Sequence, residues 1–293
     1  MPELPEVETI RVGLARLLPG KVVKDVSHDW HKSFPNAPAD VARFLVDAKI
    51  KSVRRRAKVL IIEFSSNYSL VIHLKMTGQL VFRGVEVFGA GHPTESLISD
   101  LPDKSTRVTF EFTDDSKLYF NDQRKFGWVR LIPTPLVPTI DFFKAVGPEP
   151  LDDDFTVDKF IERLLTRKNS PIKAVLLDQK VLAGVGNIYA DESLFAAKIH
   201  PATKVADVPR TKLVALYKDL RDILQLSIEK GGSTDKNYVN SEGKKGSYLS
   251  FAQVFRKQGQ PCPRCGTEII KIRVAGRGTH ICPREQRLPR GKK

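Results

Sequence analysis

Two different periodicities divide the chain into regions. Residues 21–132 contain short segments rich in β-branched and aromatic residues, separated by turn signals. These segments include VLIIEF (59–64), YSLVIHLK (68–75), RVTFEF (107–112) and KLYFND (117–122). Before them, Val7, Ile10, Leu14 and Leu17 form an apolar stripe at helical spacing. The pattern predicts a β-sandwich or barrel with a leading helix.

The second half of the chain has helical periodicity. Apolar residues recur at helical spacing between residues 155 and 230, and Gly231-Gly232 is expected to close the last helix. The Pro-rich stretch 133–139 is the best linker candidate between the two regions. Residues 233–250 are polar and rich in Gly and Ser, which predicts a loop.

The charge balance indicates a polyanionic partner. Lys and Arg number 48 against 34 Asp and Glu, which gives a formal net charge of +14 over 293 residues. Nucleic acid is the commonest partner for such a surplus. Residues 258–293 carry nine basic and two acidic residues, half of the surplus, so this segment is predicted to contact phosphates. A solubilising tail is the alternative.

Three cysteines, an odd number, argue against a disulfide framework. All three lie after residue 261, so they belong to one local feature.

No apolar run approaches the roughly 20 residues that span a bilayer, so we expect no membrane protein. The N-terminus has acidic residues where a secretory signal has lysines, and we expect an intracellular protein.

The N-terminus offers a nucleophile. Removal of the initiator methionine before a small residue would leave Pro2 with the free α-amine, whose ordinary pKa is about 7.7–8. A helix N-terminus nearby would lower that pKa, and a neutral amine can attack an electrophilic carbon to form an iminium. Glu3 is next to it and could shuttle a proton.

The start MPELPEVET resembles that of the formamidopyrimidine-DNA glycosylase family, and the resemblance covers essentially the whole chain. It implies a multidomain α/β-type fold in four parts. They are an N-terminal catalytic β-sandwich with a leading helix (1–134), a linker (135–154), a helix–two-turns–helix domain with a lesion-recognition loop (155–250) and a zinc-finger-like β-hairpin module (251–293).

The resemblance implies a bifunctional DNA glycosylase and AP lyase of base excision repair. In this family the N-terminal proline attacks C1′ of the damaged nucleotide, a Schiff base forms, and β,δ-elimination nicks the strand. Pro2 and Glu3 match the nucleophile and the acid/base residue, and Lys58 in RRRAKVLIIEF matches a catalytic-site lysine. Without the resemblance, Lys58 would belong to a solvated basic run.

Three residues resemble the family's wedge, which fills the space left by the flipped nucleotide: Met76 in HLKMTGQL, and Arg124 and Phe126 in NDQRKFGW. Arginine can donate to the orphaned cytosine. Core packing is the alternative for Met76 and Phe126, and a plain surface charge for Arg124. His73 and Lys75 flank the wedge, and His73 resembles a phosphate contact of the family.

The segment IKAVLLDQKVLAGVGNIYADE resembles the helix–two-turns–helix signature. Gly184 and Gly186 permit a tight turn, and Asn187 is expected to cap a helix that starts at Ile188. The resemblance makes Asn187 and Lys173 phosphate contacts, and Glu192 an acidic residue of the site. A glycine turn between core helices is the alternative.

The segment 233–250 matches the family's loop over the flipped purine, with Lys236 at the matching place. The length of this loop, together with Leu4, where the endonuclease VIII branch has glycine, favours oxidised purines (8-oxoguanine and formamidopyrimidines) as substrates. An endonuclease VIII-like glycosylase for oxidised pyrimidines is the enzymatic alternative. A non-catalytic damaged-DNA-binding protein is the other.

The cysteine module departs from the family's four-cysteine finger. Cys262, Cys265 and Cys282 occupy three positions, and Glu285 stands at the fourth. One Zn²⁺ per chain is expected, with Glu285, a water molecule or His280 as the fourth ligand. A finger without zinc, held by packing, is the alternative. Arg277 in VAGRGTH matches a fingertip arginine that grips a phosphate.

The implied partner is damaged double-stranded DNA. We expect a monomer in the cytoplasm, associated with the nucleoid, with no membrane contact and no small-molecule cofactor.

Overall fold

The structure, a computed structural model, describes residues 2–233 and 248–289. The described residues form two compact units. Of the described residues, the N-terminal unit comprises 2–144, 228–233 and 248, and the C-terminal unit comprises 145–227 and 249–289. The division follows contacts in space, whereas the boundaries at 134, 154 and 250 stay predictions.

The N-terminal unit consists of strands with a few helices. Its elements are α1 (Leu4–Leu17), β1 (Val23–His28), α2 (Pro38–Phe44), β2 (Ile50–Arg56), β3 (Val59–Phe64), β4 (Tyr68–His73), β5 (Gly78–Arg83), β6 (Val87–Gly91), β7 (Thr106–Phe112), β8 (Lys117–Asp122), β9 (Trp128–Pro133) and α3 (Asp141–Ala145). The predicted strands at 59–64 and 117–122 therefore begin and end where the pattern placed them.

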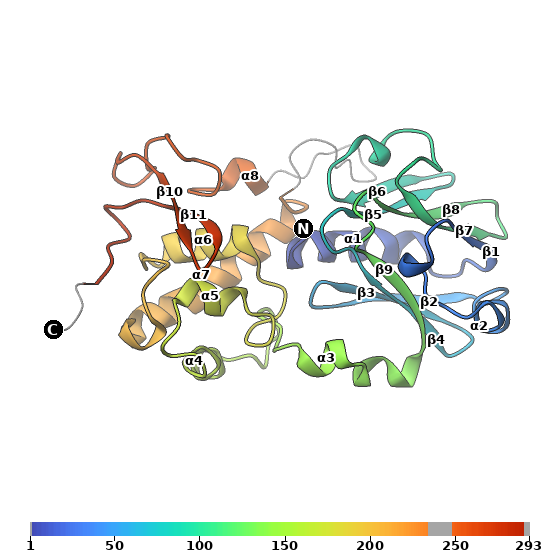
Figure 1. The fold of residues 1–293 in the computed structure, drawn as a ribbon, viewed down its shortest axis with the longest axis horizontal. Coiled ribbons are helices and arrows are strands. Elements are labelled where there is room, and N and C mark those ends of the chain that lie inside the picture. Colours follow the sequence, from blue (N-terminus) through green and yellow to red (C-terminus); the bar gives the residue numbers. More distant parts are fainter. Residues whose placement is uncertain (1, 234–247, 290–293) are drawn as a thin grey trace. The chain divides into compact units, whose positions relative to one another are not determined.

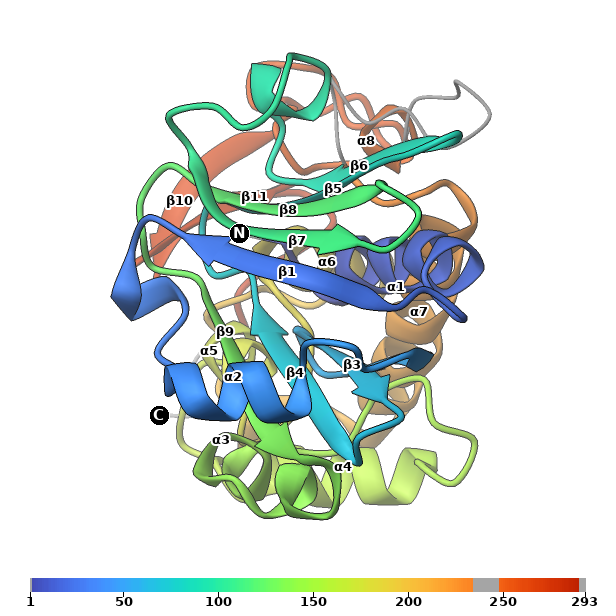
Figure 2. The same cartoon turned by 90° about the vertical axis from the view of Figure 1, so that its right-hand side faces the viewer.

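Two antiparallel sheets form the sandwich, which Figure 2 shows as separate layers. Within the described residues one sheet has the order β1-β7-β8-β5-β6 and the other has the order β2-β3-β4-β9. Buried residues of both sheets meet in one core, into which α1 inserts Val7, Ile10 and Leu14. The predicted β-sandwich with a leading helix is confirmed.

The Pro-rich stretch after β9 is folded onto the sandwich. Thr134–Thr139 is a 3₁₀ helix, and α3 follows it. Val137 is buried in a cluster with Val59, Ile61 and Val71, which lie on the face of the β2-β3-β4-β9 sheet opposite the main core. The stretch predicted as a linker therefore covers that face, because its apolar residues have a surface to pack on.

The elements that follow are mainly helical (Figure 1). They are α4 (Val157–Leu165), α5 (Ile172–Leu177), α6 (Asn187–Ala196), α7 (Arg210–Glu229), α8 (Tyr248–Phe251), β10 (Ile270–Val274) and β11 (Arg277–Ile281). The stripe of leucines at 213, 216, 220 and 224 is the buried face of α7. Gly231 and Gly232 follow its end with φ of 74° and 86°, the left-handed conformation that a helix C-terminus favours.

Strands β10 and β11 form a hairpin, whose two-residue turn is Ala275-Gly276. Both turn residues have positive φ (48° and 76°), as a tight hairpin turn requires. The turn therefore places Arg277 at the start of β11. Among the residues that the structure describes, no helix combines the length and apolar character needed to cross a bilayer.

Candidate functional site

Pro2 and Glu3 stand at the positive end of α1, and both are buried. The Glu3 backbone N–H donates to Oε2 of Glu6 at 2.8 Å, and the other oxygen of Glu6 accepts the N–H of Ser233 at 2.9 Å. Gly232 lies so close to Glu6 that a Cβ there would come within 3.3 Å of it. The residues after α7 therefore fix the turn that carries Pro2 and Glu3.

Lys58 immediately precedes β3 and is 5% exposed. It is therefore not part of a solvated basic run. Arg54 and Arg55 of the same run are paired with Glu63 and Glu8 respectively. The sandwich thus keeps Lys58 as a buried cation in the N-terminal unit, the unit that also carries Pro2 and Glu3.

His73, at the end of β4, is held as a neutral ring. Burial, with the charges of Lys75 and Lys58, lowers the pKa of His73 from 6.5 to about 3. Its Nδ1 accepts the backbone N–H of Lys75 at 3.0 Å, so the ring proton is on Nε2. The ring packs against Trp128 and Phe142. His73 can therefore offer a phosphate one neutral N–H donor, but no charge.

The three wedge candidates lie at the surface and not in the core. Met76 is 38% exposed and Phe126 is 53% exposed, although both are large apolar side chains. Arg124 is also exposed, and its guanidinium lies 4.8 Å from the centroid of the Phe126 ring. Large apolar side chains left in solvent indicate a binding surface. Core packing, the alternative for Met76 and Phe126, is excluded by this exposure.

Three predicted site residues each follow a residue with a left-handed backbone. Ala57, Lys75 and Lys125 have φ of 53°, 50° and 57°, and they directly precede Lys58, Met76 and Phe126. This conformation costs a non-glycine residue about 1–2 kcal/mol. Strained backbone of this kind clusters at functional sites, where it fixes the direction of the next side chain.

In the C-terminal unit, Asn187 and Arg277 are brought together through the hairpin. Helix α6 begins at Asn187 with Gly186 as its N-cap, so the predicted cap at Asn187 is one residue too late. The side-chain amide of Asn187 donates to the carbonyl of Gly278 at 3.1 Å. Arg277, next to Gly278, is exposed. The helix N-terminus and the fingertip arginine are therefore neighbours, which suits a phosphate site.

Lys173 has no exposed surface. Its ammonium lies 2.6 Å from Asp191 Oδ1, 2.7 Å from Thr279 Oγ1 and 3.1 Å from the Gly278 carbonyl. A side chain enclosed in this way cannot touch a phosphate in this conformation, which contradicts the direct contact expected of Lys173. Lys173 instead ties the hairpin to α6, and it acts on Arg277 through Gly278.

Glu192 is likewise enclosed, with 2% of its surface exposed. Its carboxylate accepts the backbone N–H groups of Gln253, Val254 and Phe255. Burial raises the pKa of Glu192, and those three donors oppose the rise. The residue anchors the chain that leads into the hairpin module, so its assignment to the site is corrected to a structural one.

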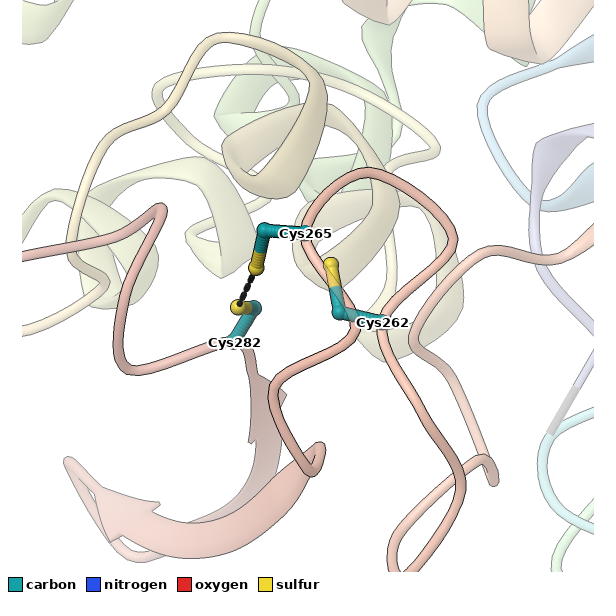
Figure 3. A group of neighbouring side chains, drawn as sticks. All are labelled: Cys262, Cys265 and Cys282. Atoms are coloured by element: carbon teal, nitrogen blue, oxygen red, sulfur yellow. Dashed lines mark hydrogen bonds between the residues drawn. The ribbon is translucent and has the colours of Figure 1, made fainter.

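The three cysteines form a metal site (Figure 3). The Sγ atoms of Cys262, Cys265 and Cys282 lie within 4.8 Å of one another, and those of Cys265 and Cys282 are 3.5 Å apart. Hydrogen bonds from Thr267 lower the pKa of Cys265 to about 7, whereas burial raises that of Cys282 to about 11. Three thiols gathered in this way fit one Zn²⁺, for which thiolates are preferred ligands.

Neither protein candidate for the fourth ligand joins this group. The Glu285 carboxylate pairs with Lys198 at 3.0 Å, and this contact lowers the pKa of Glu285. The His280 ring lies 3.2 Å from Asp191 through Nδ1. Within the described part of the chain, the metal-ligating group comprises the three cysteines. Lys236 lies outside the described residues, as does most of the predicted loop.

Sequence reasoning missed two polar residues under the wedge. Asp122 is fully buried at the end of β8, and Thr77 is buried next to Met76. An Asp at the end of a strand, before a Gln-Arg-Lys turn, is a known signal for a side chain that binds the turn's N–H groups. The pattern was therefore present, but its partner Thr77 is 45 residues away.

Three family models match the chain in the order of these elements. Residues 1–129 match the formamidopyrimidine-DNA glycosylase N-terminal domain, residues 146–238 match its H2TH domain, and residues 259–284 match a zinc finger found in FPG and IleRS. Sandwich, helical module and cysteine hairpin together define a DNA-repair glycosylase of the helix–two-turns–helix class.

Relatives extend this match over the whole chain. A formamidopyrimidine-DNA glycosylase from Pelotomaculum thermopropionicum is 38% identical, covering 98% of this chain and 100% of its own. A Lactococcus lactis FPG variant bound to Fapy-dG DNA has a TM-score of 0.85 at 34% identity, and a MutM bound to carbocyclic 8-oxo-G DNA has 0.84 at 35%. Each covers 98% of this chain and 100% of its own.

The chain belongs to the formamidopyrimidine-DNA glycosylase family. It is an enzyme, a DNA glycosylase with lyase activity at abasic sites. Its hairpin module is the zinc finger of that family with one ligand position changed, and the three cysteines fit one Zn²⁺ per chain.

Proposed function

We propose that this enzyme removes oxidised purines, 8-oxoguanine and formamidopyrimidines among them, from duplex DNA in base excision repair. The observation that carries the proposal is the full-length match to a family whose similar structures hold Fapy-dG and 8-oxo-G DNA. The long segment between α7 and α8 and the exposed Met76, Arg124 and Phe126 support purine lesions over pyrimidine lesions.

The chemistry begins at Pro2. Once the initiator methionine is removed, the secondary amine of Pro2 attacks C1′ of the damaged nucleotide. The bond from C1′ to the base breaks, the base leaves with a proton, and an iminium links Pro2 to the opened sugar. Glu3 carries the protons, and β,δ-elimination then releases the sugar from both phosphates. The fixed turn at Glu3 and Glu6 holds these groups in place.

Apart from Lys173, the remaining predicted residues bind the DNA. Lys58 supplies a buried positive charge for a phosphate next to the lesion. Lys75 supplies a second positive charge for the DNA backbone. Asn187 and Arg277 form a separate phosphate grip. Met76 and Phe126 enter the stack, while Arg124 donates to the orphaned cytosine. Lys236, which lies outside the described residues, is a further candidate for DNA binding.

The proposal extends to partners and location. The enzyme acts on damaged duplex DNA as a monomer in the cytoplasm, at the nucleoid. It needs no small-molecule cofactor, because Pro2 itself supplies the nucleophile. The zinc holds the hairpin module and takes no part in bond breaking.

A side-by-side excision assay tests the substrate class. Duplexes with 8-oxoguanine or thymine glycol opposite their normal partners are treated with the same enzyme under single-turnover conditions. Faster release of 8-oxoguanine is expected. Preference for thymine glycol would replace the proposal with an endonuclease VIII-like activity, and release of neither base would favour a binding protein without catalysis. Glu3→Gln is the matched control, with the same shape and no acid/base function.

A further inference from the structure

Two surface loops carry the three wedge residues, and we call them the wedge loops: residues 74–77 and residues 123–127. They lie between β4 and β5 and between β8 and β9 respectively. Apart from the Arg124–Phe126 stacking, the wedge side chains project from these loops into solvent. Something below the surface must therefore keep the two loops together.

The buried Asp122 carboxylate organises the second loop. Its Oδ2 accepts the backbone N–H groups of Phe126 at 2.8 Å and Gly127 at 2.6 Å, and its Oδ1 accepts that of Arg124 at 3.1 Å. Only glycine fits at 127, because a Cβ there would lie 3.1 Å from Asp122 Oδ2 and 2.6 Å from the ring of Phe120. One carboxylate thus sets the whole turn around Arg124 and Phe126.

Thr77 connects this turn to the first loop. Its hydroxyl donates to Asp122 Oδ1 and accepts the N–H of Arg124 at 3.1 Å. Thr77 is 8% exposed and directly follows Met76. The single hydroxyl therefore joins the loop of Met76 to the loop of Arg124 and Phe126.

A third residue, Arg107, holds the backbone of Asp122 in place. Arg107 is 4% exposed, and its Nε donates to the backbone carbonyl of Asp122 at 2.9 Å. Its guanidinium also binds Asp29 and the carbonyl of Lys104. The backbone N–H of Asp122 donates to the carbonyl of Ser105 at 2.7 Å. The carboxylate is thus held on a rigid base, as a precise site requires.

We propose that Thr77 and Asp122 are positioning residues that lock the two wedge loops into one unit before DNA binds. This inference rests on the proposed function, because it needs Met76, Arg124 and Phe126 to enter the DNA stack. Ordering two free loops at the moment of insertion would cost conformational entropy. The hydroxyl–carboxylate link removes that cost, so the wedge inserts as a preformed shape.

The test compares Thr77→Val, which removes the hydroxyl at nearly constant shape, with Thr77→Ser, which keeps it. Single-turnover excision of 8-oxoguanine opposite cytosine is expected to fall about tenfold in Thr77→Val and to stay near wild type in Thr77→Ser. The fluorescence of 2-aminopurine next to the lesion, which reports unstacking by the wedge, should rise more slowly in Thr77→Val alone. Equal losses in both variants would overturn the proposal.

A double-mutant cycle shows whether Thr77 acts through the wedge. In a Met76→Ala/Phe126→Ala background, Thr77→Val should cause no further loss of excision, because no wedge remains to be positioned. A further tenfold loss in that background would contradict the inference. Thermal unfolding of each variant identifies any loss that comes from the fold.

Borohydride trapping separates this inference from the proposed function. Single-stranded abasic DNA has no stacked partner, so the wedge is not needed, and Thr77→Val should trap as fast as wild type. Absence of trapping in the wild type itself would remove the proposed function. Trapping by the wild type together with unchanged excision and fluorescence in Thr77→Val would remove the positioning role alone.

Discussion

At the scale of single residues, burial decides what each predicted site residue can do. Lys58 and Lys173 are both buried, and Lys173 is bonded to acceptors in the hairpin and α6. His73 has lost its charge, whereas Met76 and Phe126 keep apolar surface in water. The same residue types would carry different roles in a different packing, so chemistry here is assigned by environment as much as by motif.

His73 should make folding stability depend on pH. In the folded chain the ring stays neutral down to a pKa of about 3, while in the unfolded chain it protonates below about 6.5. The unfolded state therefore binds more protons, and stability falls as pH decreases from about 6.5 to about 3 by up to about 1.4 kcal/mol per unit. Urea unfolding at pH 7 and pH 5 measures this effect. Between these two pH values, the free energy of unfolding should decrease less in His73→Gln than in the wild type. Equal losses would contradict the neutral ring.

At the scale of elements, the hairpin β10–β11 is held by two independent supports. One is the polar cluster of Lys173, Asp191 and Thr279, and the other is the apolar packing of Cys262, Cys282 and their neighbours against Phe195. The first fixes the fingertip, and the second encloses the metal site. The position of Arg277 should therefore depend on the buried ion pair as well as on zinc.

Lys173→Met tests the structural role of the buried lysine. The change removes the cation from the buried Asp191 carboxylate and leaves it only its contacts with His280, so unfolding should become easier by about 3–5 kcal/mol. In an Arg277→Ala background the change should leave the salt dependence of DNA binding by the folded fraction unaltered, because the Lys173 ammonium is itself buried and acts only on the position of Arg277. A lower salt slope with unchanged stability would show that Lys173 does contact a DNA phosphate.

Substitution of Glu285 tests the metal site. Because Lys198 holds this carboxylate, Glu285→Gln should leave zinc affinity unchanged in chelator competition. Glu285→Cys adds a fourth thiolate and should tighten binding at least tenfold. With Co²⁺ as the probe, wild type should show the spectrum of three thiolates with an exchangeable fourth donor, which shifts on addition of imidazole. Weaker binding in Glu285→Gln would make Glu285 a ligand.

The sequence pattern predicted some elements well and missed others for physical reasons. The strands at 59–64 and 117–122 and the leucine stripe of α7 carry strong periodic signals, because each buries one clear face. Helix α2 was missed because none of its residues is buried, so it has no apolar stripe to detect. The roles of Lys173 and Glu192 depend on partners up to 106 residues away, which no local pattern reports.

At the scale of the whole molecule, the phosphate contacts that we propose draw on the surplus of +14 and are carried by both units. Lys58 belongs to the N-terminal unit, and Asn187 with Arg277 belongs to the C-terminal unit. DNA affinity should therefore fall steeply with salt, and each phosphate contact should contribute about one to the slope of log K against log salt.

Arg277→Ala measures one of these contacts. Binding to a lesion duplex should weaken, and the salt slope should decrease by about one. Arg277→Lys keeps the charge and should keep the slope, although it loses the two-pronged donor geometry of arginine. An unchanged slope in Arg277→Ala would show that the fingertip does not touch a phosphate.

In the function that we propose, Pro2 is the nucleophile of a bifunctional glycosylase. Borohydride trapping of methionine-trimmed protein on an abasic duplex tests it most directly, with peptide mass analysis of the product. A covalent complex of one chain per DNA, with the added mass on the peptide that begins at Pro2, is the predicted result. The absence of a complex, or attachment through a lysine, would show that Pro2 is not the nucleophile.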